Sequence, residues 1–366
     1  MLNPTLLTQK ALNRALLERQ LLLRRSKLSP AKALAHLVGM QAQVPTSPYV
    51  GLWTRLAGFR PDQLSLLIRN RRAVRIVVMR STLHLVTSED CLTLWPVLQA
   101  MLRRRLQHSE FGRNVVGLNS ETLVAAGRIM MEERPRTHGD LSKLLTEHWP
   151  DRDGSSLAFA LRTLLASIQP PPRGIWGEGG QATWTPAENW LGRSVSSETS
   201  PNKMILRYLA AFGPASVSDI QAWSGLNALR EVVEELRPSL RTFHDEGDRE
   251  LFDVRAAPLG DPETPAPVRF LPEFDNALLG HADRTRIIPR EYKTPMVIGK
   301  PAVLVDGFVR GIWKIARHRG AATLTITLWE RPSRKDGTAL RLEGAQLLAF
   351  AAADAADRKI EITVSG

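Results

Sequence analysis

The hydrophobic and polar positions follow one order of elements that recurs three times along the chain. Each time, a cap residue opens an apolar helix, a second helix follows, and two short β-rich runs around a turn come last. Apolar residues three and four apart are typical of a helix, and strict alternation is typical of a strand. This order is typical of a winged helix, so the pattern predicts three winged-helix modules in tandem.

The cap residues are the most specific part of this pattern. Ser29 stands before a first-turn proline, and Thr137 and Ser216 each stand three residues before an aspartate. A side-chain oxygen at these positions can accept a hydrogen bond from a backbone N–H of the first helical turn. The predicted elements that follow are a helix after Pro61 with strands at 74–78 and 82–86, a helix at 155–168 with a Gly-rich hairpin at 173–185, and a helix at 228–236 with strands at 240–243 and 250–254.

Longer helices precede the modules, and the end of the chain changes to strands. Helical spacing predicts helices at 6–24, 88–107 and 202–211. After a proline-rich stretch the predicted strands are 268–271, 302–305, 308–314, 322–328 and 360–364, with a turn at Asp306-Gly307 and a helix at 344–356. We therefore expect a mainly helical α+β protein with modules at 1–87, 88–192 and 193–257 and an antiparallel, β-barrel-like domain at 258–366.

Composition narrows the class of protein. The chain has 366 residues, 43% of them hydrophobic, which is enough for a sizeable core. A single cysteine, Cys91, excludes an internal disulfide and a multi-thiolate metal site, and no His/Cys/Asp cluster suggests a metal or another cofactor. The chain shows neither a signal-peptide pattern at its start nor an 18-residue apolar run. We expect a soluble cytoplasmic monomer with no membrane partner and no obligate protein partner.

The basic residues point to a polyanion. Lysine and arginine number 49 against 37 acidic residues, a net charge of +12, and 39 of the 49 are arginines. Arginine offers a planar fork for bidentate contact with phosphate or guanine. Nucleic acid is therefore the first partner to consider, although a GC-rich coding sequence would also favour arginine.

A pair of glutamines is the most unusual local feature. Gln41 continues the apolar stripe of the helix that Ser29 opens, so a polar side chain is sent toward the buried side, where it needs partners. Gln41 and Gln43 would point apart on a helix but share a face in an extended segment. Pro45 disfavours helical conformation at Val44, so the helix is expected to end here and the two amides can converge.

Converging amides could hold a water molecule. A neutral amide is too weak a base to deprotonate water at pH 7, but it can orient a nucleophile and stabilise developing positive charge. Such a catalyst suffices only for an activated leaving group. The alternative is that both amides cap the helix end and bind neighbouring backbone.

Several blocks of sequence together resemble a known family, the winged-helix DNA glycosylases of the AlkZ type. The blocks extend over nearly the whole chain and are MQAQVPTSPYVGLWTRL at 40–56, MRSTLHLVTSED at 79–90, RGIWGEGGQATWTPAENWLG at 173–192, FLPEFDNALLGHADRTRII at 270–288 and LVDGFVRGIWK at 304–314. The family's Gln-x-Gln catalytic motif corresponds to Gln41-Ala42-Gln43. A related branch has aspartate at the second position, so this chain is similar to the branch that includes self-resistance enzymes against DNA-alkylating natural products.

The resemblance implies a fold and an activity. It implies three winged helices and a β-barrel around a basic concave surface for double-stranded DNA carrying alkylated guanine. It also implies monofunctional hydrolysis of the N-glycosidic bond of N7-alkylguanine, without lyase activity, with bulky or crosslinking natural-product adducts as the first choice and N7-methylguanine as the fallback. The cationic base leaves neutral without a general acid, so two amides that position water would suffice. Gln43 is the expected principal water-positioning residue, supported by Gln41.

Further candidates for DNA contact lie in the same blocks. They are Arg80, Thr82, His84, Arg173, Trp176, Asp275, Arg284 and Arg286. The alternatives are that His84 is a structural histidine, that Trp176 packs on its own module, and that Asp275 forms an ion pair with Arg284 or Arg286. Two other functions also fit the charge, namely a nonenzymatic winged-helix DNA-binding regulator and a resistance protein that sequesters a cationic or intercalating drug.

Overall fold

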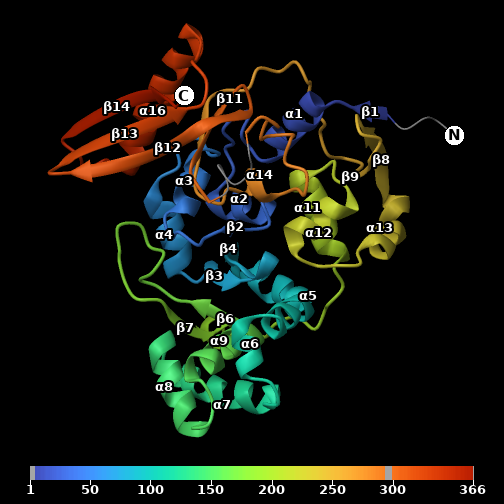
Figure 1. Ribbon diagram of the computed structural model, residues 1–366, viewed down its shortest axis with the longest axis vertical. Coiled ribbons are helices and arrows are strands. Elements are labelled where there is room, and N and C mark those ends of the chain that lie inside the picture. The colour runs from blue at the N-terminus through green and yellow to red at the C-terminus, as the bar shows by residue number, and fades with distance from the viewer. Residues whose placement is uncertain (1–4, 293–298, 366) are drawn as a thin grey trace.

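The computed structural model describes residues 5–292 and 299–365 of an elongated α+β protein (Figure 1). Helices α6 to α9 form one end, and the C-terminal sheet lies at the other. The helices are α1 (Gln9–Arg19), α2 (Pro30–His36), α3 (Ser47–Trp53), α4 (Pro61–Arg69), α5 (Ser88–Gln107), α6 (Glu110–Asn114), α7 (Ser120–Glu133), α8 (His138–His148), α9 (Gly154–Leu164), α10 (Ala187–Leu191), α11 (Asn202–Phe212), α12 (Val217–Ser224), α13 (Arg230–Leu236), α14 (Asn276–Leu279) and α16 (Arg334–Ala351).

A six-stranded sheet joins the first two predicted modules. Its strands are β2 (Met40–Gln41), β3 (Ala73–Val77), β4 (Leu83–Thr87), β5 (Arg136–Thr137), β6 (Ser167–Gln169) and β7 (Thr183–Pro186). They lie in the order β2-β4-β3-β6-β7-β5, so β3 of the first module pairs with β6 of the second. The short strand β2 forms one edge, where Gln41 lies opposite His84 in antiparallel register.

The second predicted module differs from the expectation in two places. Helix α9 ends at Leu164 rather than at 168, because residues 167–169 extend into β6 and pair with β7. The Gly-rich hairpin predicted at 173–185 is wrong, because residues 170–182 form a loop without strands and β7 follows it. The glycines therefore serve an irregular loop rather than a two-stranded wing.

The first helix, α1, is shorter than the predicted helix at 6–24, partly because the residues before it form a strand. Residues Thr5–Leu7 form β1, which pairs in parallel with β8 (Leu240–Asp245), and β8 pairs with β9 (Glu250–Val254). The Thr8 side chain then caps α1 by accepting from the Ala11 N–H. Helix α1 is thus joined to sequence more than 200 residues away.

The C-terminal strands form an open sheet, so the predicted antiparallel β-barrel is wrong. The strands are β10 (Arg269–Leu271), β11 (Ala302–Val305), β12 (Phe308–His318), β13 (Ala321–Leu328) and β14 (Asp357–Val364), in that order across the sheet. Helix α16 crosses between β13 and β14, which makes their pairing parallel. This helix starts at Arg334, ten residues before the predicted 344, and packs buried Leu340, Leu347 and Leu348 against the sheet.

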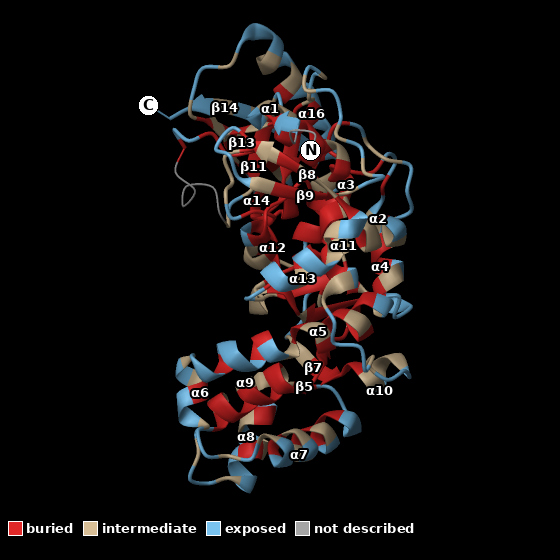
Figure 2. Cartoon of the chain, turned by 90° about the vertical axis from the view of Figure 1, so that its right-hand side faces the viewer, coloured by how far each residue is buried: buried red, intermediate tan, exposed pale blue. Residues whose placement is uncertain are grey.

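Buried residues lie along the length of the molecule (Figure 2). One cluster joins part of the C-terminal sheet to α11 and α5, and another packs α9 against α7 and α8. Buried arginines cross-link distant segments within this core. Arg19 of α1 forms a two-bond ion pair with Asp253 of β9, and Arg55, just after α3, forms one with Asp275 at the start of α14. Both pairs are fully desolvated, so they hold the α1, α3 and α14 segments in fixed relative positions.

Candidate active site

The glutamine motif is an extended segment at the edge of the six-stranded sheet. Ala42, between the two glutamines, is fully buried, and its N–H donates to the Leu83 carbonyl at 2.8 Å. Its own carbonyl accepts from Arg75 Nη2 at 2.8 Å. Neighbouring residues of an extended chain face opposite ways, so Gln41 and Gln43 are expected on one side of the segment and Ala42 on the other. The helix ends before the glutamines, but earlier than expected, because α2 ends at His36 rather than near Val44 and Gln41 already belongs to β2.

Both glutamine amides are held by donors from the segment opposite. Oε1 of Gln41 accepts from Arg80 Nη2 at 2.9 Å, and Oε1 of Gln43 accepts from the Leu83 N–H at 3.3 Å. Guanidinium and backbone N–H groups only donate, so each amide must turn its oxygen toward the protein. Gln41 is 6% exposed whereas Gln43 is exposed, so Gln43 is the more accessible of the two amides.

Arg80 occupies a constrained turn between β3 and β4. It lies in a 3-10 turn at Met79–Ser81 with φ 56°, in the left-handed region that residues other than glycine rarely adopt. Its Nη1 donates to the Trp223 carbonyl of α12 at 2.7 Å. Arg80 therefore connects the glutamine segment to the third predicted module.

His84 is buried and neutral. Burial and the neighbouring Arg80 charge lower the pKa of His84 to about 3, although its bond to the Thr82 carbonyl opposes the shift. Nδ1–H donates to that carbonyl at 2.9 Å, and Thr82 Oγ1 donates to the Met79 carbonyl. His84 and Thr82 thus lie beside the glutamines as predicted, but His84 cannot act as an acid at neutral pH.

Arg173 and Trp176 lie on the loop at 170–182. Arg173 Nη1 donates to the Gly180 carbonyl at 2.9 Å, within the same loop. The Trp176 ring packs on Tyr49 of α3 and on Phe350 of α16, with ring centroids 5.0 and 5.3 Å apart. Trp176 also lines a groove of about 890 Å³, which Thr46 and Ser47 border just after the glutamine motif. Trp176 therefore packs on helices outside its own predicted module, whereas the alternative expected it to pack within that module.

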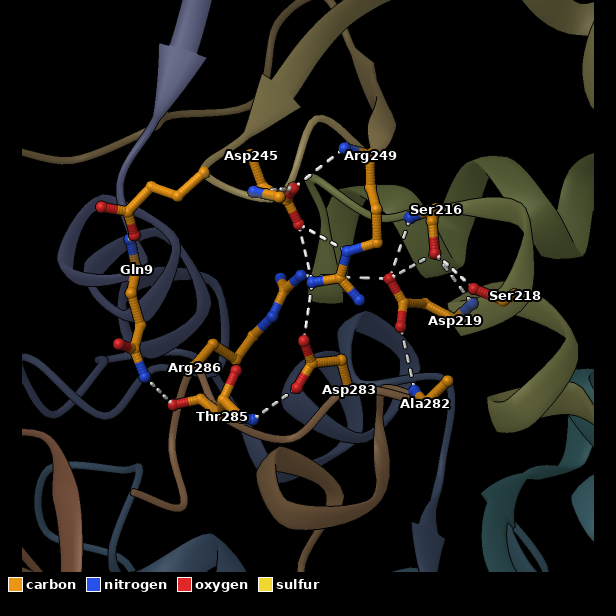
Figure 3. A network of polar contacts seen from close by, with 12 residues as sticks. Gln9, Ser216, Ser218, Asp219, Asp245, Arg249, Ala282, Asp283, Thr285 and Arg286 are labelled. Carbon is orange, nitrogen blue, oxygen red and sulfur yellow. Dashed lines mark hydrogen bonds and ion pairs between the residues drawn. The ribbon is translucent and has the colours of Figure 1, made fainter. Parts of the chain in front are cut away.

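Asp275 and Arg286 are structural. The predicted pairing of Asp275 with Arg284 or Arg286 is wrong, because Arg55 takes both carboxylate oxygens at 2.7 and 2.8 Å. Arg286 is buried, donates to the Pro214 carbonyl at 2.9 Å and faces Asp219. Figure 3 shows Asp219 bonded to Ser216 and to the Ala282 N–H in a network around Arg286. Among the eight candidates, which all lie in the described residues, these two are the ones with an ion-pair partner.

Arg75 supports the motif but was not predicted from the sequence. It is 2% exposed, and its bond to the Ala42 carbonyl holds the backbone between the two glutamines. Burial, with a smaller contribution from Arg173, lowers the pKa of Arg75 to about 10. The available signal was a charged residue inside the apolar run Ala73–Val77, where an arginine must have an internal partner.

A family model described as "DNA glycosylase AlkZ-like" matches residues 34–350 of the chain, which includes the glutamine motif and all of the other candidate residues. The chain belongs to the AlkZ-like family of DNA glycosylases. Among curated proteins, it is 24% identical over 332 residues to the "Interstrand DNA cross-link repair glycosylase" of Streptomyces sahachiroi, covering 82% of this chain and 85% of that protein.

The solved structures agree on the fold. The Streptomyces sahachiroi DNA glycosylase AlkZ superposes with a TM-score of 0.80 and 22% identity, covering 99% of this chain and 100% of that one. Within residues 5–292 and 299–365 of this AlkZ-like protein, no helix is long and apolar enough to cross a membrane. The same residues contain no group of three or more His, Cys, Asp or Glu side chains arranged to hold a metal ion.

Proposed function

We propose that this AlkZ-like DNA glycosylase is monofunctional and hydrolyses the N-glycosidic bond of N7-alkylguanine in double-stranded DNA, with Gln41 and Gln43 as catalytic residues. The observation that carries the proposal is the pair of amides at and just after the edge strand β2, each of which accepts from a donor in residues 80–83. A fixed amide can position water without reorganising during the reaction.

The surroundings favour a leaving group that needs no protonation. In the described part of the chain, no carboxylate forms a hydrogen bond or ion pair with Gln41, Gln43, Arg80 or His84. His84 is neutral at pH 7, because burial and Arg80 lower its pKa to about 3. Ordinary glycoside hydrolysis uses a carboxylic acid to protonate the departing oxygen. A site without such an acid suits a base that is already cationic.

Hydrolysis balances without an added acid. The C1′–N9 bond breaks with its electron pair moving to the cationic base, which leaves neutral, while positive charge develops on the sugar. A water oxygen held by Gln43 then forms the bond to C1′ and releases its proton to solvent. The second lone pair of each amide oxygen is free to accept from this water or to face the developing charge.

We propose bulky or crosslinking adducts of a DNA-alkylating natural product as the preferred substrates. The support is the similarity to the Streptomyces sahachiroi relative, which is named an interstrand DNA cross-link repair glycosylase. We also propose that the chain divides into three winged-helix modules at 1–87, 88–192 and 193–257 and a C-terminal domain at 258–366. The monomeric state and the cytoplasmic location are two further proposals. Sedimentation and cell fractionation test the last two.

Single-turnover excision tests the function. Duplexes carry one N7-methylguanine or one bulky intercalator adduct, and alkaline cleavage at the abasic site reports release of the base. We expect release by the wild type and none above background by the Gln41/Gln43 double alanine variant. Salt-sensitive DNA binding without release from any adduct would instead support the DNA-binding regulator. Drug binding in the absence of DNA, again without release, would support sequestration.

A further inference from the structure

Three arginines with no carboxylate partner come from segments that contact α12 or its C-terminal end, close to the glutamine motif. Arg80, Arg105 and Arg284 come from the turn after β3, from α5 and from the loop after α14. In the described residues, none of the three is within ion-pair distance of an acidic group, whereas most buried arginines are paired. Arg80 and Arg284 are half-buried, and Arg105 is exposed. Burial comes first in lowering the pKa of Arg80 to about 10, and the charges of Arg284 and Arg105 lower it further.

Arg105 reaches this place because α5 packs against the Arg80 turn. A Cβ atom added to Gly225 would lie 3.1 Å from the Arg80 Cα and 3.4 Å from the Met101 sulfur. Gly225, the Arg80 backbone and Met101 of α5 therefore meet at one point. Arg105 follows Met101 by four residues on the same helix, so it lies on the same face one turn further on.

Arg284 is held in place by the bonds of its neighbours. Asp283 pairs with Arg249, and the Ala282 N–H donates to Asp219 at 2.9 Å (Figure 3). Arg286 donates to the Pro214 carbonyl. The Arg284 side chain itself has no protein partner in the described residues, and its Nε is buried without a hydrogen bond. The loop is thus fixed while this guanidinium stays available.

The like charges of half-buried Arg80 and Arg284 and of exposed Arg105 repel one another, which destabilises the free protein. An anion that accepts hydrogen bonds from all three would relieve this repulsion. The flanking backbone phosphate of a DNA strand has the charge and the oxygens that arginine forks bind. A carboxylate ligand has the same charge but cannot accept from three separate directions as readily.

We propose that Arg80, Arg105 and Arg284 form a subsite for one backbone phosphate next to the reacting nucleotide. This inference rests on the proposed function for its DNA ligand and adds the contact that places the strand. Arg80 has two of its five N–H donors engaged, by Gln41 and by the Trp223 carbonyl, so three are left for phosphate. One guanidinium thereby joins the bound phosphate to the Gln41 amide, which fixes the distance between the backbone and the catalytic pair.

The test measures binding rather than excision. The probe is a duplex with one tetrahydrofuran abasic-site analogue, in which single phosphates on either side are replaced in turn by neutral methylphosphonates. Fluorescence anisotropy gives Kd for the wild type, for Arg284→Met and for Arg105→Met. Arg104→Met is the matched control, because it removes the same charge from the adjacent position of α5. Arg80 is left intact because it also holds Gln41.

We expect one methylphosphonate position to weaken wild-type binding by about tenfold, as for loss of one charged hydrogen bond. The same substitution should have a smaller effect on Arg284→Met and on Arg105→Met, each of which has lost one of the three contacts, and its full effect on Arg104→Met. The inference is overturned if every position weakens all four proteins by the same factor. If the subsite behaves as expected but no adduct is excised, the subsite stands and the proposed glycosylase activity fails.

Discussion

Arginines in two regions of this molecule differ in whether they have an acidic partner. Around α1, α3 and α14, Arg19 and Arg55 are buried and completely paired with Asp253 and Asp275. Beside the glutamine motif, Arg80 and Arg284 are partly buried and have no acidic partner in the described residues. The first region is neutral inside and holds segments together. The second keeps its positive charge, which destabilises the free protein and is useful only when an anion arrives.

This contrast separates structural charge from functional charge better than composition does. The net charge of +12 is the same whichever arginines are neutralised. What matters is where the acidic residues lie. Asp253 and Asp275 pair with arginines where distant segments pack together, whereas in the described residues no acidic residue pairs with Arg80 or Arg284 beside the glutamines. Changes in the first region should therefore act on stability, and changes in the second on binding and rate.

The largest expected effect follows from Arg55→Ala. Removing this guanidinium leaves the Asp275 carboxylate buried without its partner, which should lower the free energy of unfolding by about 3 to 5 kcal/mol. Urea denaturation measures this change. Replacing both residues by apolar side chains, as in Arg55→Met with Asp275→Leu, should recover a large part of the loss. A loss below about 1 kcal/mol for Arg55→Ala would break the comparison.

Acid should destabilise the fold through His84. In the unfolded chain a histidine binds a proton near pH 6.5, whereas burial and Arg80 lower the pKa of folded His84 to about 3. The unfolded state therefore binds more protons between pH 6.5 and 3, and stability falls as the pH falls through this window. The slope approaches about 1.4 kcal/mol per pH unit for one histidine.

His84→Asn keeps a donor for the Thr82 carbonyl and removes the titration. Denaturation midpoints at pH 7 and pH 4.5 should therefore differ less for this variant than for the wild type. Equal acid sensitivity would show that other groups, such as buried His281, account for the loss.

The single change Gln43→Ala should act on rate alone. We expect single-turnover excision to fall at least about tenfold with DNA affinity nearly unchanged, because the lost contact is made in the transition state. Gln346→Ala, on the exposed face of α16, is the matched control and should excise at the wild-type rate. An unchanged rate in well-folded Gln43→Ala would remove Gln43 from the mechanism.

The smallest effect is expected at an exposed ion pair. Arg193 and Glu89 lie 2.8 Å apart with side chains 58% and 64% exposed. Solvent screens such a pair, so Arg193→Ala should change the free energy of unfolding by about 0 to 1 kcal/mol. Thermal denaturation beside Arg55→Ala compares an exposed with a buried partner directly, and similar losses would contradict the contrast.

Local signals in the sequence predicted much of the fold. Helix α5 begins and ends where its spacing indicates, and the capping boxes at Thr137 and Ser216 are present. The failures lie where long-range pairing decides. Residues 5–7 have helical spacing yet join β8, and the crossover helix α16 makes β14 parallel and leaves the sheet open. Neither partner is visible from the local pattern.

The sequence predicted the glutamine segment of the candidate site but not the arginines that hold the surrounding residues in place. An extended Gln41–Gln43 segment beside Thr82 and His84 followed from Pro45 and from strand alternation. The ion-pair partner of Asp275 could not be predicted from the sequence. Arg55 is 220 residues away from Asp275, and nothing in the local sequence selects it over Arg284 or Arg286. Arg75 was missed because strand alternation describes which side a residue faces and not what bonds it needs.

The pairing of β1 with β8 has a consequence for how the chain is made. Residues 5–7 leave the ribosome well before their partners at 243–245 are synthesised. Helix α1 waits longer still, because Asn13 donates to the carbonyls of Arg286 and Gly307. The segment that carries β1 and α1 must stay without these partners until the distant segments have been synthesised, so its tertiary contacts form late.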